Sequence, residues 1–223
     1  SYYEKVIEIN PNYPITHYNM GNIFKKKGEI QKAISCYEKA ITIDPNYISP
    51  HINLGIIFQE LAEDDKAKDC YEKVIIIEPN YTIAHNNLGN IFKKLGEHKK
   101  AISCFEKAIE INPDFTEANY NLGVIFHELG KYEKAKNCYE KTIKIDPKNT
   151  RGLNNLGHVY HELNEDYKSR DYFKKAIEIN PDFTGAHWNS QGCATGIDEA
   201  LIIFKKINKI DNTYINAKIM IGA

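Results

Sequence analysis

Arginine is scarce in this chain, and neither sign of charge dominates it. Only Arg151 and Arg170 are arginines, so the planar, bidentate recognition of phosphate that arginine provides is poorly supplied. The 29 basic residues are balanced by 30 acidic residues, which leaves a formal charge of -1. General binders of nucleic acid or of membrane surfaces favour a basic excess or stripe. The composition therefore argues against nucleic acid and against a membrane as partners.

Other signals are missing as well. No apolar run approaches the roughly 18 residues that a membrane-spanning helix needs, and residues 1–13 show no secretory signal pattern. The chain begins in mid-pattern, so the expectation of a cytoplasmic protein is a default. Phosphate-cradling glycine loops, the HExxH motif and the nucleophile elbow are all absent from the sequence. We therefore expect no enzyme activity, no catalytic residue and no cofactor.

Six prolines recur at one unvarying interval along the chain: Pro11, Pro45, Pro79, Pro113, Pro147 and Pro181. A strict period of this length indicates an array of one small structural repeat. Repeat arrays offer extended surfaces, whereas catalysis usually needs one pocket in which unlike residues converge. Five full repeats follow from the period, at residues 14–47, 48–81, 82–115, 116–149 and 150–183.

Each repeat carries two helical patterns, which we call helix A and helix B. In repeat 82–115 the first pattern has the helical spacing i, i+3, i+4, i+7 and the second has a spacing of three or four. The first comprises His85, Leu88, Gly89 and Phe92, and the second comprises Ala101, Phe105 and Ala108. Gly96 lies between them and is expected to end helix A. Pro113 is expected to end helix B, because proline disfavours helix at the residue before it.

This pattern resembles the tetratricopeptide repeat: a large residue, Leu-Gly, an aromatic residue, Ala-x3-aromatic and then proline. Departures are mild, with Thr142 and Ser169 in two alanine slots. The resemblance implies an all-α fold, a right-handed α-solenoid of antiparallel helix pairs, in which helix A lines a concave groove. It is specific to fold and weakly specific to function.

We expect residues 1–223 to form a single solenoid that is part of a longer protein. Residues 1–13 match helix B of a partial repeat, residues 184–214 a shortened repeat, and residues 215–223 the start of a further one. The segment from Asn189 to Asp198 is irregular. It is either a degenerate repeat or a hinge or docking notch that holds a reactive cysteine, Cys193.

The other four cysteines, Cys36, Cys70, Cys104 and Cys138, recur at the same interval as the prolines. Equivalent positions on neighbouring packed helices lie roughly 8–10 Å apart or more, whereas a disulfide needs Cα atoms within about 7 Å. We therefore expect buried or half-buried thiols that pack as small hydrophobic groups.

Asparagines recur on the face of helix A beside the packing stripe. Position 6 of each repeat is Asn19, Asn53, Asn87, Asn121, Asn155 or Asn189, and position 9 adds Asn22 and Asn90. A carboxamide can pair with both the C=O and the N–H of an extended peptide. The row resembles the asparagine ladder in the repeat domain of O-linked N-acetylglucosamine transferases, which implies peptide binding. The alternative is that these side chains form hydrogen bonds within or between helices.

Other surface hypotheses remain open. The repeats that bind a terminal carboxylate use several cations, of which this chain keeps only Arg151 in the equivalent slots, so the charge-assisted hydrogen bonds are largely missing. His158, His161 and Glu162, with His127 one repeat earlier, have a spacing compatible with a metal site, although chance adjacency is the simpler explanation; we predict no metal. Positions 12 and 13 alternate between Lys-Lys and more acidic pairs, which would give a ligand a preferred direction or would be solvated charge.

The sequence thus predicts a protein–protein interaction scaffold that binds an extended peptide or protein segment in its concave groove through the helix-A asparagines. One alternative is a substrate-recognition arm of a larger enzyme, such as a glycosyltransferase, whose catalytic domain lies outside this chain. Another is an assembly scaffold that self-associates through its uncapped ends.

Overall fold

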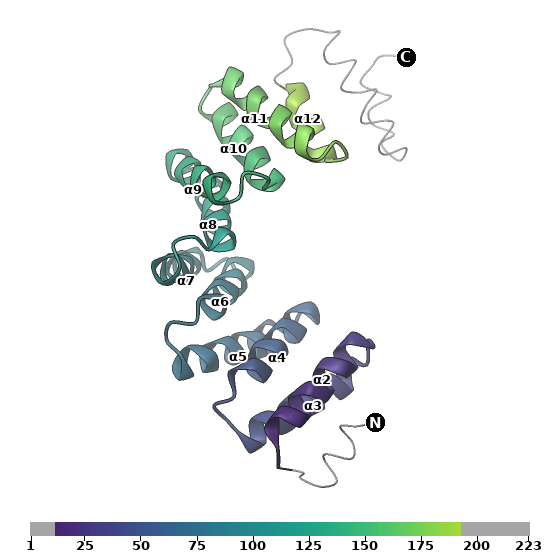
Figure 1. The fold of residues 1–223 in the computed structure, drawn as a ribbon. Coiled ribbons are helices and arrows are strands. Elements are labelled where there is room, and N and C mark those ends of the chain that lie inside the picture. The colour runs from purple at the N-terminus through teal and green to yellow at the C-terminus, as the bar shows by residue number, and fades with distance from the viewer. Residues whose placement is uncertain (1–11, 193–223) are drawn as a thin grey trace. The chain divides into compact units, whose positions relative to one another are not determined.

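The computed structural model describes residues 12–192, and within them every regular element is an α-helix. The helices are α2 (Pro14–Lys26), α3 (Ile30–Ile43), α4 (Ile48–Glu60), α5 (Asp64–Ile77), α6 (Thr82–Lys94), α7 (His98–Ile111), α8 (Thr116–Glu128), α9 (Tyr132–Ile145), α10 (Thr150–Glu162), α11 (Asp166–Ile179) and α12 (Thr184–Gly192). Figure 1 shows them as successive antiparallel pairs joined by short turns. The predicted all-α fold of helix pairs is confirmed.

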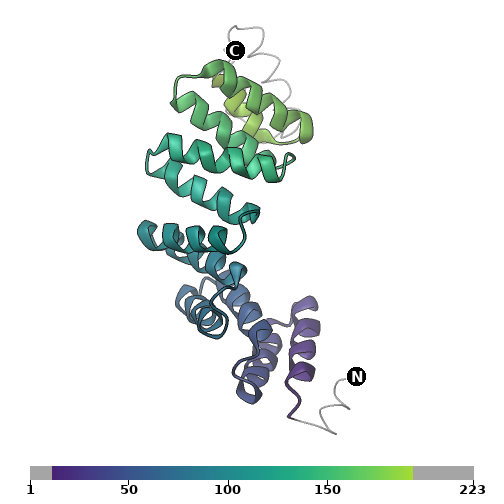
Figure 2. The same ribbon diagram turned by 60° about the vertical axis from the view of Figure 1, so that its left-hand side comes forward.

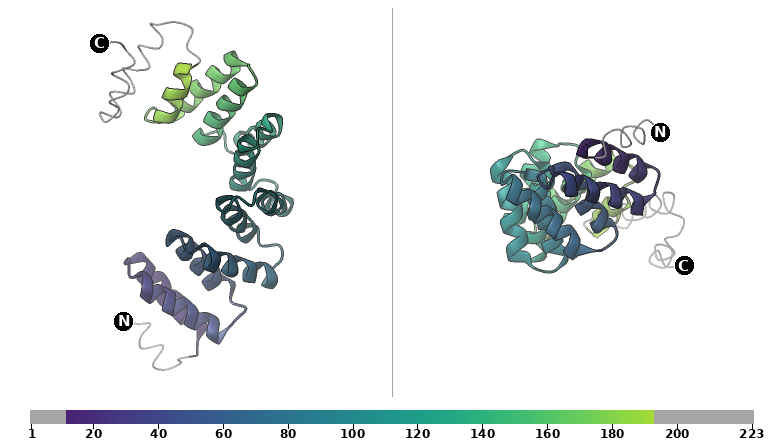
Figure 3. Two further views of the ribbon diagram at one scale, coloured as in Figure 1. Left: turned by 180° about the vertical axis from the view of Figure 1, so that it is seen from behind. Right: turned by 90° about the horizontal axis from the view of Figure 1, so that it is seen from below.

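The chain divides into two compact units, Ser1–Pro113 and Asp114–Ala223. The described part of the first unit holds α2 to α7, and that of the second holds α8 to α12. In each unit, the second helix of a pair also packs against the first helix of the next pair, as the turned views in Figures 2 and 3 show. We call α2, α4, α6, α8, α10 and α12 the A helices, and α3, α5, α7, α9 and α11 the B helices.

Each A–B pair is held by one aromatic ring that lies on a glycine. The ring of Phe105 on α7 is fully buried, and a Cβ added to Gly89 on α6 would lie 2.7 Å from it. The same arrangement joins Gly21 to Tyr37, Gly55 to Tyr71, Gly123 to Tyr139 and Gly157 to Phe173, at 2.5–2.7 Å in each case. Real Cβ atoms do not approach a ring so closely, so glycine is the residue that lets the two helices meet here.

The alanine slots on either side of the ring are also fully buried. Ala101 and Ala108 flank Phe105, and both have no exposed surface. Three of these slots hold another residue and are accommodated, because Val74, Thr142 and Ser169 are equally buried. The Thr142 hydroxyl donates a 2.9 Å hydrogen bond to the Cys138 carbonyl one turn earlier, which satisfies a group that would otherwise be costly to bury.

The turn from helix A to helix B needs a left-handed residue. Gly28, Gly96 and Gly130 have φ angles of 77°, 74° and 67°, and Ala62 and Asn164 take the same conformation at 58° and 60°. The prediction that glycine ends helix A is therefore correct in three repeats. Asparagine tolerates this region, whereas alanine is strained in it by roughly 1–2 kcal/mol.

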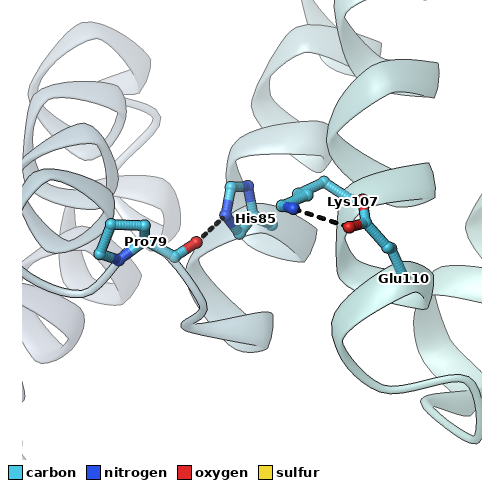
Figure 4. A network of polar contacts seen from close by, with 4 residues as sticks. All are labelled: Pro79, His85, Lys107 and Glu110. Atoms are coloured by element: carbon cyan, nitrogen blue, oxygen red, sulfur yellow. Dashed lines mark hydrogen bonds and ion pairs between the residues drawn. The ribbon is translucent and has the colours of Figure 1, made fainter.

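The start of helix A is tied to the preceding proline corner. His85 Nε2 lies 2.8 Å from the Pro79 carbonyl oxygen, and Figure 4 shows the ring at the start of α6 turned towards it. His51 and His187 bond Pro45 and Pro181 in the same way, at 3.0 and 2.9 Å. Because a carbonyl oxygen only accepts, Nε2 carries the proton in each ring. Figure 4 also shows the Lys107–Glu110 ion pair on α7.

Lysines cover the outer aromatic residue of five A helices, α2, α4, α6, α8 and α10. Lys100 Nζ lies 5.1 Å from the centroid of the Phe92 ring and also pairs with Glu97. The same cation–π contact joins Lys32 to Phe24, Lys66 to Phe58, Lys134 to Phe126 and Lys168 to Tyr160, at 5.1–5.5 Å. Such exposed contacts contribute about 0.5–1 kcal/mol each.

The cysteine prediction is confirmed for the described residues. Cys36, Cys70, Cys104 and Cys138 are free and half-buried. Burial raises the pKa of Cys70 to about 12 and that of Cys104 to about 11, so these thiols are poor nucleophiles. Cys193, the segment after Gly192 and the predicted partial repeats 1–13 and 215–223 lie outside the described residues, apart from Asn12 and Tyr13.

The Gly89–Phe105 contact predicts the effect of adding one methyl group. We expect Gly89→Ala to lower the free energy of unfolding by about 1–3 kcal/mol, the usual cost of overpacking, although alanine is the better helix former. The double variant Gly89→Ala, Phe105→Leu should lose less than the sum of the two single losses, because leucine leaves room for the methyl group. Urea unfolding measures all three variants. Strictly additive losses would show that the ring does not impose the glycine.

A second prediction concerns pH. Burial lowers the pKa of His51 from its ordinary value of 6.5, so the unfolded chain binds this proton first as the pH falls. The contribution of His51 to stability is therefore present above pH 6.5 and is lost as the pH drops below it. His51→Asn, which copies Asn119 at the same position of another repeat, should lose less unfolding free energy between about pH 7.5 and pH 5.5 than the wild type. Equal losses in urea unfolding at the two pH values would contradict this.

Candidate functional site

All eight predicted asparagines lie on A helices, and all are half-buried. Asn19, Asn22, Asn53, Asn87 and Asn90 belong to the first compact unit, and Asn121, Asn155 and Asn189 to the second. Position 5, which the sequence placed on the same face, is more deeply buried in three repeats, at Ile52, Asn86 and Asn154. The accessible part of the face therefore consists mainly of positions 2, 6, 9, 12 and 13.

In the first unit, Asn22 and Asn53 form a hydrogen-bonded network around the hydroxyl of Tyr37. The Tyr37 hydroxyl donates to Asn22 Oδ1 at 2.7 Å. Asn53 Nδ2 donates to the same oxygen at 2.9 Å and to the Tyr37 hydroxyl at 3.2 Å. Three helices, α2, α3 and α4, are thereby linked by side chains that face the candidate surface. The Oδ1 atom of Asn53 keeps its acceptor capacity.

The next repeat uses the same parts with different partners. The Tyr71 hydroxyl donates to Gln59 Oε1 at 2.6 Å and is hydrogen-bonded to Asn87. Asn86 Nδ2 donates to Asn87 Oδ1 at 3.3 Å. Asn90 is half-buried and has no hydrogen bond to any described residue, so neither end of its carboxamide is used within the described part of the protein.

In the second unit the network centres on Asn155. Its Nδ2 atom lies 3.2 Å from the Tyr120 hydroxyl and 3.3 Å from the Tyr139 hydroxyl. Asn189 Nδ2 donates to Asn154 Oδ1 at 2.8 Å. Burial raises the pKa of Tyr139 well above its usual range, while its bond to Asn155 opposes the rise, so the hydroxyl stays protonated. These contacts support the alternative in which the asparagines join neighbouring helices.

The tyrosine hydroxyls were missed by the sequence reasoning, which treated the aromatic slot of helix B as packing only. A signal was available. Tyrosine fills this slot in the repeats that precede Asn53, Asn87 and Asn155, always at the same distance along the chain, whereas Phe105 and Phe173 fill it without a hydroxyl. The five lysines that cover the outer aromatic residues were equally visible, since one occurs at the same position of every full repeat.

The histidine hypothesis for a metal is not supported within the described residues, where no group of three potential ligands is arranged to hold an ion. His158 packs edge-on against Phe173, with ring centroids 5.3 Å apart. His161 pairs with Asp166 at 2.9 Å. Burial lowers the pKa of His158, and the charges of His127 and His161 lower it further. The three imidazoles influence one another but do not converge on one point.

The charge alternation at positions 12 and 13 is partly satisfied by the protein itself. Lys94 Nζ lies 2.7 Å from Asp64 Oδ2, which joins α6 to α5. Lys25 and Lys26 at the end of α2 and Lys93 on α6 form no ion pair with a described residue.

In the part of the chain that the structure covers, no helix has the length and apolar character required to cross a membrane.

Comparison with known families agrees with this geometry. Models described as "Tetratricopeptide repeat" match residues 14–47, 82–115 and 150–183, residues 48–81 and residues 104–137. A model described as "TPR repeat" matches residues 124–164. These matches and the helix pairs define a class of helical repeat proteins that serve as interaction scaffolds. The chain belongs to the tetratricopeptide repeat family.

Solved structures show the same likeness. YrrB, described as "a TPR protein with an unusual peptide-binding site", has 25% sequence identity and a TM-score of 0.68, and the match covers 83% of this chain and 96% of that one. A MamA protein has 27% identity and a TM-score of 0.68, with 76% and 92% covered. PilF of Pseudomonas aeruginosa shares the fold at 17% identity, with a TM-score of 0.79 and coverage of 93% and 96%. A search of curated protein sequences gives no match.

The Tyr37 network predicts that its hydroxyl stabilises the fold. Tyr37→Phe should lower the free energy of unfolding by about 0.5–1.5 kcal/mol, because the hydroxyl is hydrogen-bonded to Asn22 and Asn53. Tyr167→Phe is the matched control, since Tyr167 is 81% exposed and should change stability by less than about 0.5 kcal/mol. Urea unfolding compares the two. Equal effects would mean that the network does not link the helices.

Proposed function

We propose that this chain is a protein-interaction scaffold that binds an extended peptide segment along the exposed face of its A helices, using the position-6 and position-9 asparagines. The family and the structural likeness support a scaffold of this kind, and the fold is typical of non-catalytic proteins. The peptide mode is favoured by the likeness to YrrB, whose structure is described as having a peptide-binding site. The observation that carries the proposal is the row of half-buried carboxamides on successive A helices.

The hydrogen bonds within the protein restrict what the row offers to a ligand. Asn53 uses its Nδ2 atom for Asn22 and Tyr37, so its Oδ1 atom is the part that remains, and it accepts. Such an oxygen pairs with a backbone N–H of a ligand. Asn90 offers both a donor and an acceptor. An extended main chain has N–H and C=O groups at regular intervals and suits this mixture without dictating side chains.

The structural and binding roles of the asparagines are compatible. A carboxamide fixed by the protein loses less conformational entropy when a ligand binds, and such preorganisation raises affinity. The Tyr37 and Tyr139 hydroxyls hold Asn53 and Asn155 in this way. We infer that the tyrosines orient the carboxamides, and that the Asn53 Oδ1 atom, which accepts no hydrogen bond from a described residue, receives the ligand.

The alternatives of a substrate-recognition arm and of a self-associating scaffold have no specific support among the described residues. The sequence that flanks residues 1 and 223 addresses the first, since a nucleotide-sugar-binding domain would support it. Light scattering of the chain on dilution addresses the second.

Asn90 provides the test of peptide binding, because it makes no hydrogen bond within the described part of the protein. Screening the wild type on arrays of short peptides supplies the bound peptides, and fluorescence anisotropy then measures their Kd. Asn90→Ala should raise the Kd of these peptides about three- to tenfold, as expected for the loss of one or two neutral hydrogen bonds of about 1 kcal/mol. It should not change the free energy of unfolding. Asn137→Ala, which removes an exposed carboxamide from α9, is the control.

Asn53→Ala should weaken binding of the same peptides and also destabilise the fold, because Asn53 is proposed both to bind the ligand and to link neighbouring helices. A wild type that captures no peptide from the arrays would contradict the proposed function. Binding that survives both Asn90→Ala and Asn53→Ala unchanged would leave a scaffold but remove the asparagine mechanism.

A further inference from the structure

We propose that Arg151, whose guanidinium lies over the ring of Tyr120, anchors an internal aspartate or glutamate side chain of the peptide that binds along the A helices of the second unit. This inference rests on the proposed function and adds the chemistry that sets the register of the ligand.

Arg151 is positioned before any ligand arrives. It lies exposed in the first turn of α10, and its Cζ atom is 5.2 Å from the centroid of the Tyr120 ring. The ring is itself fixed from two sides. Asn155 Nδ2 donates to its hydroxyl at 3.2 Å, and the Tyr139 ring packs against it with centroids 5.9 Å apart. A guanidinium held on such a platform gives up little freedom on binding.

The donors of Arg151 are available. Arg151 forms no ion pair and no hydrogen bond with a described residue, although Glu117 lies in the first turn of the neighbouring helix α8. The cation–π contact with Tyr120 engages none of the guanidinium N–H groups of Arg151 in a hydrogen bond. Those groups match the two oxygens of a carboxylate in a bidentate, charge-assisted pair. The chemistry of the unpaired group therefore selects an acid.

The position of Arg151 makes the selection local. It is the single lysine or arginine on α8, α10 and α12 over their described lengths, whereas Glu117, Glu128 and Glu162 give the same helices several acidic groups. The histidines of this face are His127, His158 and His161. An acidic ligand residue thus has one favourable place and meets repulsion elsewhere, which fixes the register of the segment and disfavours other alignments.

The occupant is a side chain within the segment. Asn121 on α8 and Asn189 on α12 continue the row of carboxamides on the helices before and after α10, so a bound main chain would extend past Arg151 in both directions. Capture of a terminal carboxylate would instead place the end of the ligand here and leave part of the row unused.

The test uses the whole chain and the same arrays of short peptides. Each peptide is made with its acidic residues, with Asp→Asn and Glu→Gln replacements, and with a free or an amidated C-terminus. Peptides bound by the wild type should share one acidic position, and losing that carboxylate should weaken binding about tenfold or more. Arg151→Gln should cause the same loss of affinity for the acidic peptide. It should cause no further loss for the peptide in which that Asp or Glu is replaced by Asn or Gln.

Two variants control the interpretation. Arg151→Lys should recover part of the affinity, because lysine keeps the charge without the bidentate fork. Lys174→Gln removes one exposed charge from α11 and should leave affinity unchanged, which excludes a general effect of net charge. The thermal stability of each variant is checked first, so that a loss of affinity is not caused by unfolding. Affinities are then measured at two salt concentrations, since the attraction between two exposed charges weakens with salt.

The outcomes separate this inference from the proposed function. Bound peptides without a shared acid, with equal affinity for Arg151→Gln, would overturn the Arg151 assignment and leave peptide binding intact. Dependence on a free C-terminus would replace the side chain with a terminal carboxylate and also overturn it. A wild type that binds no peptide would remove the proposed function, and this inference with it.

Discussion

The contact between a buried aromatic ring and a glycine is the constraint on which the other features of the repeat depend. An A helix and a B helix can approach closely only where the A helix has no Cβ, as at Gly21, Gly55, Gly89, Gly123 and Gly157. The ring then fills the space, and a small or medium-sized residue one turn away on either side (alanine, serine, threonine or, at Val74, valine) lets the backbones close around it. The left-handed turn residue sets one end of this packed pair, and at His51, His85 and His187 the histidine bond to the proline corner sets the start of the A helix.

The same ring connects the core to the candidate surface. In Tyr37, Tyr71 and Tyr139 the ring is buried, while its hydroxyl reaches the asparagines and Gln59 on the A-helix face. The orientation of a surface carboxamide is thereby set by a residue whose own position is fixed by packing. A phenylalanine in this slot keeps the packing and loses the connection. The chain uses both residues, so the core is uniform while the surface varies from repeat to repeat.

The fold could be predicted from the sequence because it depends on local, repeated features. The regular recurrence of proline, glycine and aromatic residues determines the helix pairs almost independently of the rest of the chain. The deeper burial of Ile52, Asn86 and Asn154 was not predicted, since helical spacing places position 5 at the edge of the buried stripe and only neighbouring helices decide its exposure. The contact of Arg151 with Tyr120 was missed for a related reason: arginine occurs at this position in one repeat only, so no periodic pattern indicates the contact.

This contrast indicates where information about a ligand lies in a repeat protein. Residue types that recur at every period, such as the glycines and the position-6 asparagines, present the same chemical group in each repeat and discriminate little between one alignment of a ligand and another shifted by one repeat. Discrimination needs residues that occur once. Along the described A helices of the second unit, the one permanent cation is Arg151, in the first turn of α10. In the first unit, the lysines of α2 and α6 lie in the last turns of those helices. In the proposed binding mode, the periodic residues therefore contact the main chain of the ligand, and the residues that depart from the period set its sequence preference and its direction.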